Sequence, residues 1–131
     1  WTDGDHVSTM FGHMVFNLER KAVKHLEREC RPTKKHYVGS ERCVSLVQVM
    51  QKLAIADKRL AQTAIDEAIA AGGNSGRLNR ADKQLKKADT AVANGKYDDA
   101  IKHYRKAWKH AMKSINVDVS NRGDWEPDND D

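Results

Sequence analysis

The sequence is poor in the features that mark membrane spans and the common enzyme classes. No apolar run approaches the roughly 20 residues needed to cross a bilayer, so we expect a soluble chain. The sequence also lacks a Gly-x-Ser-x-Gly turn, a phosphate-binding glycine loop and the Cys-x-x-Cys-His motif that attaches haem covalently. We therefore predict that the protein is not an enzyme. Its 131 residues suffice for one domain with a single core.

Only two cysteines are present, and their spacing predicts a disulfide. Cys30 and Cys43 bracket a 12-residue loop between two predicted helices, where a bond would restrict the unfolded chain by about 2–3 kcal/mol. A disulfide favours an oxidising compartment, and two unpaired thiols are the alternative. The chain starts at Trp1 without an initiator Met, as in a mature protein that has lost a signal peptide or in a fragment. We expect an exported protein, periplasmic or extracellular.

Charged residues make up 32% of the chain and are unevenly distributed. The formal net charge is +4, but residues 118–131 carry six acids against the single Arg122, and Asp3 and Asp5 add two more. The two ends therefore hold −7, which leaves about +11 on residues 6–117. A basic body attracts nucleic acid, an anionic membrane surface, an acidic protein or the chain's own acidic tail, and charge alone does not choose among them.

Apolar residues recur at three- and four-residue steps in four segments, which predicts four amphipathic helices. We expect them over about 6–29, 40–71, 77–93 and 98–116. Gly72 and Gly73 would end the second helix, and Asn94 and Gly95 the third. The predicted inner faces are, in chain order, Val7, Phe11, Met14, Val15, Leu18, Ala22 and Leu26; Leu46, Val47, Met50, Leu53, Ala61, Ala64 and Ala68; Leu78, Ala81, Leu85, Ala88 and Val92; and Ala100, Ile101, Tyr104, Ala107, Trp108, Ala111 and Ile115.

The second and third connections are short, and short connections make neighbouring helices antiparallel. We therefore predict an all-α fold, an up-down-up-down four-helix bundle. The alternative is a pair of stacked helical hairpins, which a partial repeat supports: residues 56–60 (Ala-Asp-Lys-Arg-Leu) recur as residues 81–85 (Ala-Asp-Lys-Gln-Leu). The predicted division is an N-terminal extension (1–5), a helical bundle domain (6–117) and an acidic, flexible tail (118–131).

Residues 93–107 read Ala-Asn-Gly-Lys-Tyr-Asp-Asp-Ala-Ile-Lys-His-Tyr-Arg-Lys-Ala and resemble the turn and second helix of a tetratricopeptide repeat. The resemblance implies a tight turn, a Tyr packed across it and close helix approach at alanines. These roles would fall to Gly95, Tyr97, Ala100, Tyr104 and Ala107. The Trp-x-x-Leu-Gly signature and the closing Pro of the family are absent, so the resemblance covers one hairpin, about residues 77–113, and no array. The same region is similar to Ala- and Lys-rich helical modules of exported bacterial proteins. Both resemblances imply protein contact.

Histidines and methionines of the first predicted helix suggest a different function. His6, Met10 and His13 lie along one side at four- and three-residue steps, together with Met14 and Asn17. Imidazole and thioether groups in this arrangement could bind copper or serve as axial haem ligands. The structural alternative is that the two methionines fill the core and the two histidines are solvated.

His103 and His110 repeat the seven-residue spacing in the fourth predicted helix. His13 and His110 would lie at comparable heights in the bundle, where facing helices can build metal sites. A periplasmic copper or haem protein using His6, Met10, His13 and His110 is thus the alternative to a protein without a cofactor.

Asp57 falls near the centre of the second helix's apolar face, where a carboxylate needs a partner. Residues predicted at the same level are Asn17, Arg80 and His110. We predict a structural hydrogen bond or ion pair there, and no catalysis. His25 is predicted on the inner face of the first helix, as a core or loop-capping histidine.

Basic residues gather at the first turn, and the start of the fourth helix adds Lys96 and Lys102. The cluster comprises Arg28, Arg31, Lys34, Lys35, His36 and Arg42. Tyr37 is the sole aromatic residue there, and nucleic-acid binding would need interleaved aromatic residues for stacking, so it is not favoured. In the tail, Trp125 stands between Asp124 and Glu126, the pattern of a docking segment whose Trp fills a groove while acids steer it to a basic surface.

We predict a non-catalytic protein-binding or assembly module. The predicted partner-binding residues are Arg31, Lys34, Lys35, Arg42, Trp125 and Glu126. One form of this function is self-association, in which the basic body of one copy binds the acidic end of the next and so forms a ring or filament.

Overall fold

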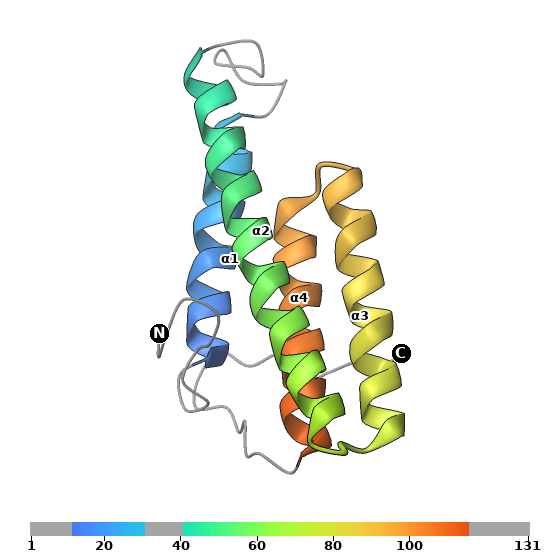
Figure 1. Cartoon of the computed structure of the whole chain (residues 1–131). Coiled ribbons are helices and arrows are strands. Elements are labelled where there is room, and N and C mark those ends of the chain that lie inside the picture. Colours follow the sequence, from blue (N-terminus) through green and yellow to red (C-terminus); the bar gives the residue numbers. More distant parts are fainter. Residues whose placement is uncertain (1–11, 31–40, 116–131) are drawn as a thin grey trace.

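A computed structural model describes residues 12–30 and 41–115 as four α-helices (Figure 1). These are α1 (Gly12–Glu29), α2 (Glu41–Ala70), α3 (Ser75–Ala93) and α4 (Tyr97–Ser114). The helices run alternately in opposite directions, which confirms the predicted all-α bundle, and these ranges contain no strand. None of these four helices is long and apolar enough to span a membrane.

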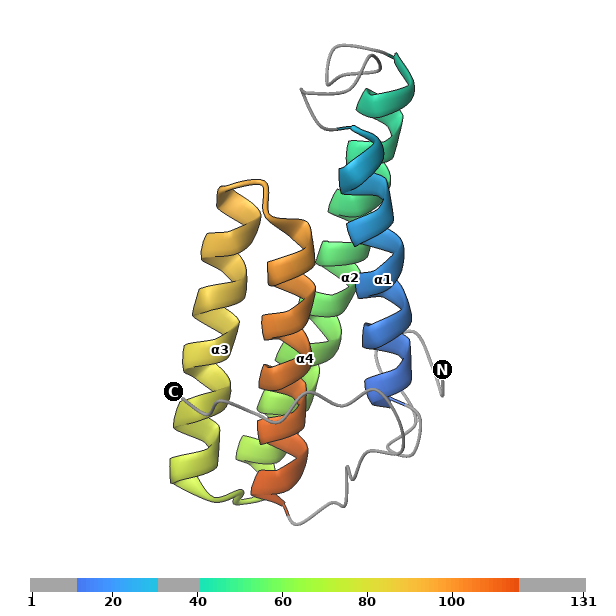
Figure 2. The same cartoon turned by 180° about the vertical axis from the view of Figure 1, so that it is seen from behind.

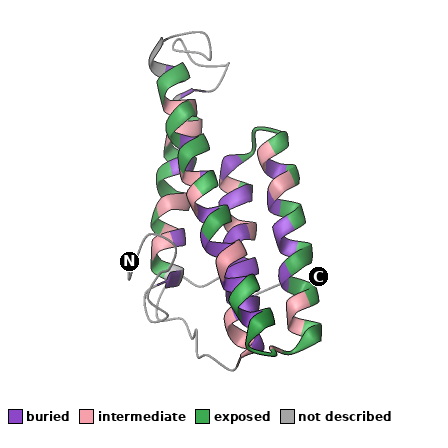
Figure 3. Cartoon of the chain, viewed as in Figure 1, coloured by how far each residue is buried: buried purple, intermediate pink, exposed green. Residues whose placement is uncertain are grey.

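Helix α4 is the centre of the bundle and packs against all three other helices. Twelve of its 18 residues are buried, which makes it the most buried helix (Figure 3). Ala100, Ala107 and Ala111 are fully buried, and their small side chains let neighbouring backbones approach closely. Seen from behind, α4 lies between α1 and α3, with α2 on its far side (Figure 2).

Two glycine turns set the geometry around α3. Gly72 and Gly95 adopt φ values of 74° and 71°, a conformation that other residues rarely adopt. At Gly73, a Cβ atom would lie 2.9 Å from the carbonyl oxygen of Ala68 and would also clash with Ser114. The next residue, Asn74, donates its backbone N–H to the carbonyl oxygen of Ser114 at 2.9 Å. The turn between α2 and α3 is therefore bonded to the end of α4.

The predicted inner faces of the last three helices are confirmed. Each predicted residue is buried or is a partly buried residue packed against the core, apart from Leu46, which is half-buried. The helical hairpin predicted for residues 77–113 is present as α3 and α4. Tyr97 and Tyr104 of α4 are both buried.

The predicted inner face of the first helix is wrong in part: Val15 and Leu26 do pack against the core, and Val7 and Phe11 lie outside the described residues. Met14 and Leu18 are 46% and 64% exposed, and Ala22 is exposed as well. The buried residues are instead Gly12, Phe16, Val23 and Cys30. The helix carries apolar residues around more than half of its circumference, and its contacts with α4 decide which of them are buried.

The predicted disulfide joins α1 to the start of α2, at an end of the molecule that extends beyond the α3–α4 turn (Figure 1). Cys30 and Cys43 have Cα atoms 5.6 Å apart, and both side chains are buried. With 30 residues, α2 is about 45 Å long, whereas the 19 residues of α3 span about 28 Å. The projecting end thus has neither α3 nor α4 beside it, and the disulfide is its main restraint.

Replacing Cys30 and Cys43 by Ser should lower the free energy of unfolding by about 2–3 kcal/mol, because the cross-link no longer restricts the unfolded chain. Urea denaturation under non-reducing conditions measures the loss. Amide hydrogen exchange should show protection decreasing first at the end of α1 and the start of α2, with α3 unchanged. Equal loss of protection in α3 would contradict a local role for the bond.

Candidate functional site

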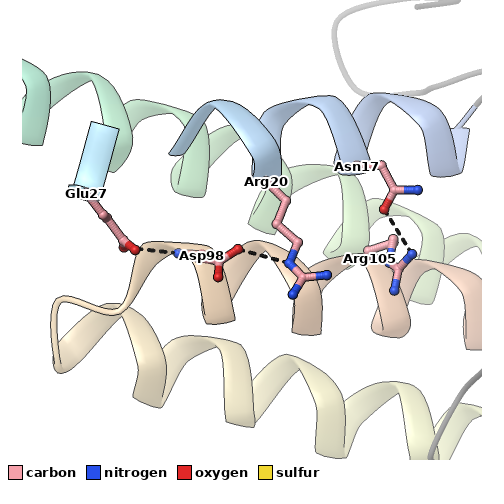
Figure 4. Close-up of polar contacts among 5 residues, drawn as sticks. All are labelled: Asn17, Arg20, Glu27, Asp98 and Arg105. Carbon is pink, nitrogen blue, oxygen red and sulfur yellow. Dashed lines mark hydrogen bonds and ion pairs between the residues drawn. The ribbon is translucent and has the colours of Figure 1, made fainter. Parts of the chain in front are cut away.

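Polar contacts fix α1 beside α4 (Figure 4). Arg20 donates from Nε to a carboxylate oxygen of Asp98 at 2.9 Å, and Arg105 donates to the side-chain oxygen of Asn17 at 3.0 Å. Glu27 accepts the backbone N–H of Asp98 at 3.3 Å and so caps the first turn of α4 from another helix. Burial raises the pKa of the Glu27 carboxyl. These contacts set which side of α4 faces outward.

Asp57 is fully inaccessible to solvent, as the spacing predicted. Of the predicted partners, Asn17 and Arg80 are wrong, and His110, which is buried on α4, stays a prediction. The carboxyl that acts on Asp57 belongs to Glu19 of α1, which has a buried oxygen of its own. Asn17 is bonded to Arg105, and Arg80 is exposed on α3. Burial, followed by the neighbouring Glu19, raises the pKa of Asp57 well above its ordinary value. Asp57 is therefore a protonated, buried carboxyl that a substrate cannot reach in this conformation.

A second polar group ties three helices together. Asp89 of α3 accepts the Tyr104 hydroxyl of α4 at 2.8 Å and pairs with Lys58 of α2 at 3.0 Å. Burial, together with the hydrogen bond to Asp89, raises the pKa of Tyr104. This cluster is structural, since all three groups are engaged with one another.

A hollow of about 390 Å³ opens on the other side of the α3–α4 hairpin, near its turn. Its charged lining residues are Lys86, Lys87, Lys96, Asp99 and His103. Thr90 also lines it, but its hydroxyl donates to the carbonyl oxygen of Lys86 at 3.0 Å. The donors facing the hollow thus come chiefly from lysine side chains, which suits it to a carboxylate or another anion.

His103 lies at the floor of this hollow and is held in a defined orientation. Its Nδ1 is 2.7 Å from Oε1 of Gln84, and because an amide oxygen only accepts, Nδ1 carries the proton. Burial lowers the pKa of His103, and the cations Lys106, Lys87 and Lys102 lower it further. The ring is therefore neutral at pH 7, and an anion entering the hollow would favour its protonated form.

A row of lysines lies along α4, and two of them, Lys106 and Lys102, lower the pKa of His103. Lys102, Lys106, Lys109 and Lys113 follow one another at four-, three- and four-residue steps, which places them on one side of the helix. This lysine row lies on the side of α4 opposite the buried alanines and is about 16 Å long. The hollow and the lysine row together form the basic face of the hairpin.

Comparison with protein-family models, curated proteins and solved structures finds no match to this chain. Function is therefore inferred from the side chains themselves.

Most of the predicted partner-binding residues lie outside the described ranges. These are Arg31, Lys34, Lys35, Trp125 and Glu126. Arg42 belongs to the first turn of α2, but its side chain is not among those described. The predicted basic cluster therefore stays a prediction, and the basic surface that the structure describes is a different one. Of its residues, the sequence singles out Lys96, Lys102 and His103 as candidate functional residues.

The predicted metal ligands are not brought together in the described part of the molecule. His6 and Met10 precede it, and the side chain of His13 is not described, although its backbone lies in α1. His110 is buried on α4. Residues 12–30 and 41–115 contain no group of three or more His, Cys, Asp or Glu side chains that could hold a metal ion. The copper or haem alternative remains a prediction that rests on residues 6–13.

His25 is exposed on α1, so the core position is wrong, and the loop that it was alternatively predicted to cap lies outside the described residues. His25 is exposed for the same reason as Leu18: the side of α1 that is buried differs from the side that the spacing predicted.

Proposed function

We propose that this chain is a non-catalytic protein-binding module whose basic face receives an acidic segment of a protein partner. The observation that carries the proposal is the hollow between α3 and α4, which Lys86, Lys87 and Lys96 line together with His103. A body with about +11 would steer acidic segments toward it.

The shape of the basic face favours a linear ligand. A row about 16 Å long matches roughly five residues of extended chain, at about 3.3 Å each. Acidic side chains on such a segment would meet the partly exposed Lys102 and Lys113, and the hollow would take a carboxylate or side chain. A single small anion would use only a fraction of these cations.

The burial of the aromatic side chains favours a protein partner over a nucleic acid. All four aromatic side chains within residues 12–30 and 41–115 are buried: Phe16, Tyr97, Tyr104 and Trp108. The basic face described here thus offers no Phe, Tyr or Trp ring on which a base could stack, and stacking supplies much of the affinity of single-stranded nucleic-acid sites. The paired Cys30 and Cys43 support the further proposal that the module works in an exported, oxidising setting.

The proposed site is tested by reversing charge on it. The probe is a fluorescein-labelled peptide with the sequence of residues 118–131, and binding to the full chain is followed by fluorescence anisotropy at low salt. Replacing Lys87 and Lys96, which are exposed and line the hollow, by Glu should weaken binding at least tenfold, because two attractive contacts become repulsive. Circular dichroism establishes that the variant is folded.

The matched control replaces Lys24 and Lys52 by Glu. These side chains are exposed on α1 and α2, so the change in net charge is the same but lies away from the basic face. We expect less than a threefold effect, which corresponds to about 0.6 kcal/mol. An equal loss in both variants would mean that the probe responds to overall charge only, and the proposed site would be wrong.

A further inference from the structure

The bond between His103 and Gln84 decides which ring nitrogen is left for a ligand in the hollow between α3 and α4. Nδ1 of His103 lies 2.7 Å from Oε1 of Gln84, and the Gln84 side chain is buried, so this amide oxygen holds a proton on Nδ1. A neutral imidazole carries a single N–H. Nε2 of the neutral ring therefore has a lone pair, and it is a hydrogen-bond acceptor in the hollow that His103 lines.

A carboxylate forms no hydrogen bond with the ring in this neutral form. An ionised carboxylate accepts hydrogen bonds and donates none, and Nε2 of the neutral ring also only accepts. Two acceptors that face each other repel, so the neutral ring opposes the ligand that the lysines of the hollow attract. Protonation of Nε2 turns this acceptor into a charged donor, and a hydrogen bond between charged groups is about twice as strong as one between neutral groups. The carboxylate and the proton therefore favour each other's binding.

The surroundings of His103 keep this proton off the ring while the hollow holds no anion. Burial lowers the pKa of His103 below its ordinary value of 6.5, and the cations Lys106, Lys87 and Lys102 lower it further. Asp99 acts in the opposite direction, with the smallest effect of these groups. Lys87 belongs to α3, and the other three groups belong to α4 itself. A carboxylate in the hollow would add the negative charge that offsets these cations, so the ring would hold the proton once the ligand is bound.

We propose that the hollow is a proton-coupled carboxylate site, in which an aspartate or glutamate of the acidic partner binds together with one proton that His103 takes up at Nε2. The proton comes from the solvent and returns to it when the ligand leaves. This inference rests on the proposed function for the location of the site and adds pH control of the affinity. The bound state holds more protons than the free state, so the affinity rises as the pH falls from the pKa of the occupied site toward the lower pKa of the free ring.

Isothermal titration calorimetry with the full chain measures both the affinity and the proton uptake. The probe is the peptide of residues 118–131 without its dye and with an acetylated N-terminus, because its remaining ionisable groups titrate outside the range from pH 6 to pH 8. It should bind about three- to tenfold more tightly at pH 6 than at pH 8, since uptake of one proton changes an affinity by at most about tenfold per pH unit. At pH 7 the binding heat should vary with the ionisation enthalpy of the buffer, with a slope of up to one proton for each peptide bound.

His103→Gln removes the titrating group and keeps an amide N–H that can bond to Gln84. This variant should bind the peptide with the same affinity at pH 6 and pH 8, within about twofold, because it has no proton to gain at this position. The matched control is His25→Gln, at an exposed position on α1, which should keep the pH dependence of the unchanged chain. Circular dichroism establishes that both variants are folded.

Nuclear magnetic resonance of the His103 ring in the unchanged chain gives a readout that needs no variant. The pKa of the ring should be higher in the chain saturated with peptide than in the free chain, and the ring nitrogen shifts of the free chain should show the proton on Nδ1. Equal ring pKa values in the free and saturated chains overturn the inference. So does pH dependence that persists in His103→Gln, because another group would then take up the proton. In both cases binding that is sensitive to charge reversal at Lys87 and Lys96 still supports the proposed function. Absence of peptide binding at both pH values refutes the proposed function, and the inference falls with it.

Discussion

Asp57→Asn is expected to raise the free energy of unfolding at pH 7 by about 2–4 kcal/mol. Burial, followed by the neighbouring Glu19 carboxyl, raises the pKa of Asp57 from 3.8 to about 10. The folded chain therefore keeps a proton that the unfolded chain releases above about pH 4, so the folded state loses stability by up to about 1.4 kcal/mol for each pH unit above that value. Asn has the size of the neutral acid but never ionises, so the variant escapes this loss.

The sign of the effect follows from the direction of the pKa shift. Stability from a protonated Asp57 is complete below about pH 4 and declines as the pH rises through the neutral range. The groups around Asp57 are consistent with a raised pKa. Glu19 of α1 adds a second carboxyl. Tyr104 of α4, which is bonded to Asp89, adds no positive charge that would lower the pKa of Asp57.

Urea denaturation at pH 4, 6 and 8 measures the effect. The difference between Asp57→Asn and the unchanged chain should be small at pH 4 and should grow toward pH 8. Asp66→Asn is the matched control, since Asp66 is exposed on the same helix and accepts a hydrogen bond from Gln62 in the preceding turn. Parallel pH curves for the Asp57 variant and the unchanged chain would contradict the prediction.

Trp108→Ala is expected to lower the free energy of unfolding by about 3–5 kcal/mol, the usual loss for removing a buried large aromatic side chain. Trp108 is buried on α4, and its ring lies 5.8 Å from that of Phe16 on α1, in a tilted arrangement. An aromatic contact of this kind adds about 0.5–1.5 kcal/mol to the burial of the ring. The pair is the apolar part of the contact that holds α1 on α4.

Circular dichroism during urea denaturation is the suitable measurement, because the change removes a tryptophan fluorophore. Trp108→Phe should lose less, since a ring still faces Phe16. Leu18→Ala should change stability by no more than about 0.5 kcal/mol, because Leu18 is 64% exposed. A loss at Leu18 as large as that at Trp108 would mean that α1 packs through the face inferred from its sequence.

Helix α4 could be predicted from the sequence because its pattern is unambiguous. Apolar residues and alanines occupy one side and lysines the other, so a single packing is available. In α1, by contrast, Phe16 and Val23 compete with Met14 and Leu18 for the core. Partners 78–88 residues away, Asp98 and Arg105, decide between the two sides, and sequence spacing does not reveal them.

The candidate site was harder to predict than the fold. Lysines at helical spacing are ordinarily a solvated face, so the lysine row gives no separate signal in the sequence. The burial of Lys106 and Lys109 distinguishes the lysine row from an ordinary solvated helix face. Residue spacing does not reveal burial of this kind. Asp57 illustrates the same limit: its spacing predicted burial, but the relative position of α1 and α2 selects Glu19 as its neighbour.

The hydrogen bond between Asn74 and Ser114 has a consequence for the order in which the protein folds. This bond joins the start of the α3–α4 hairpin to its end. The side-chain hydrogen bonds within the hairpin join residues only 15–19 positions apart. Loop closure over such short separations costs little entropy, whereas α1 must find α4 across 78–88 residues. We therefore expect the α3–α4 hairpin to form early against the end of α2, and α1 to dock last. The Cys30–Cys43 disulfide would then hold α1 beside α2 after it has docked.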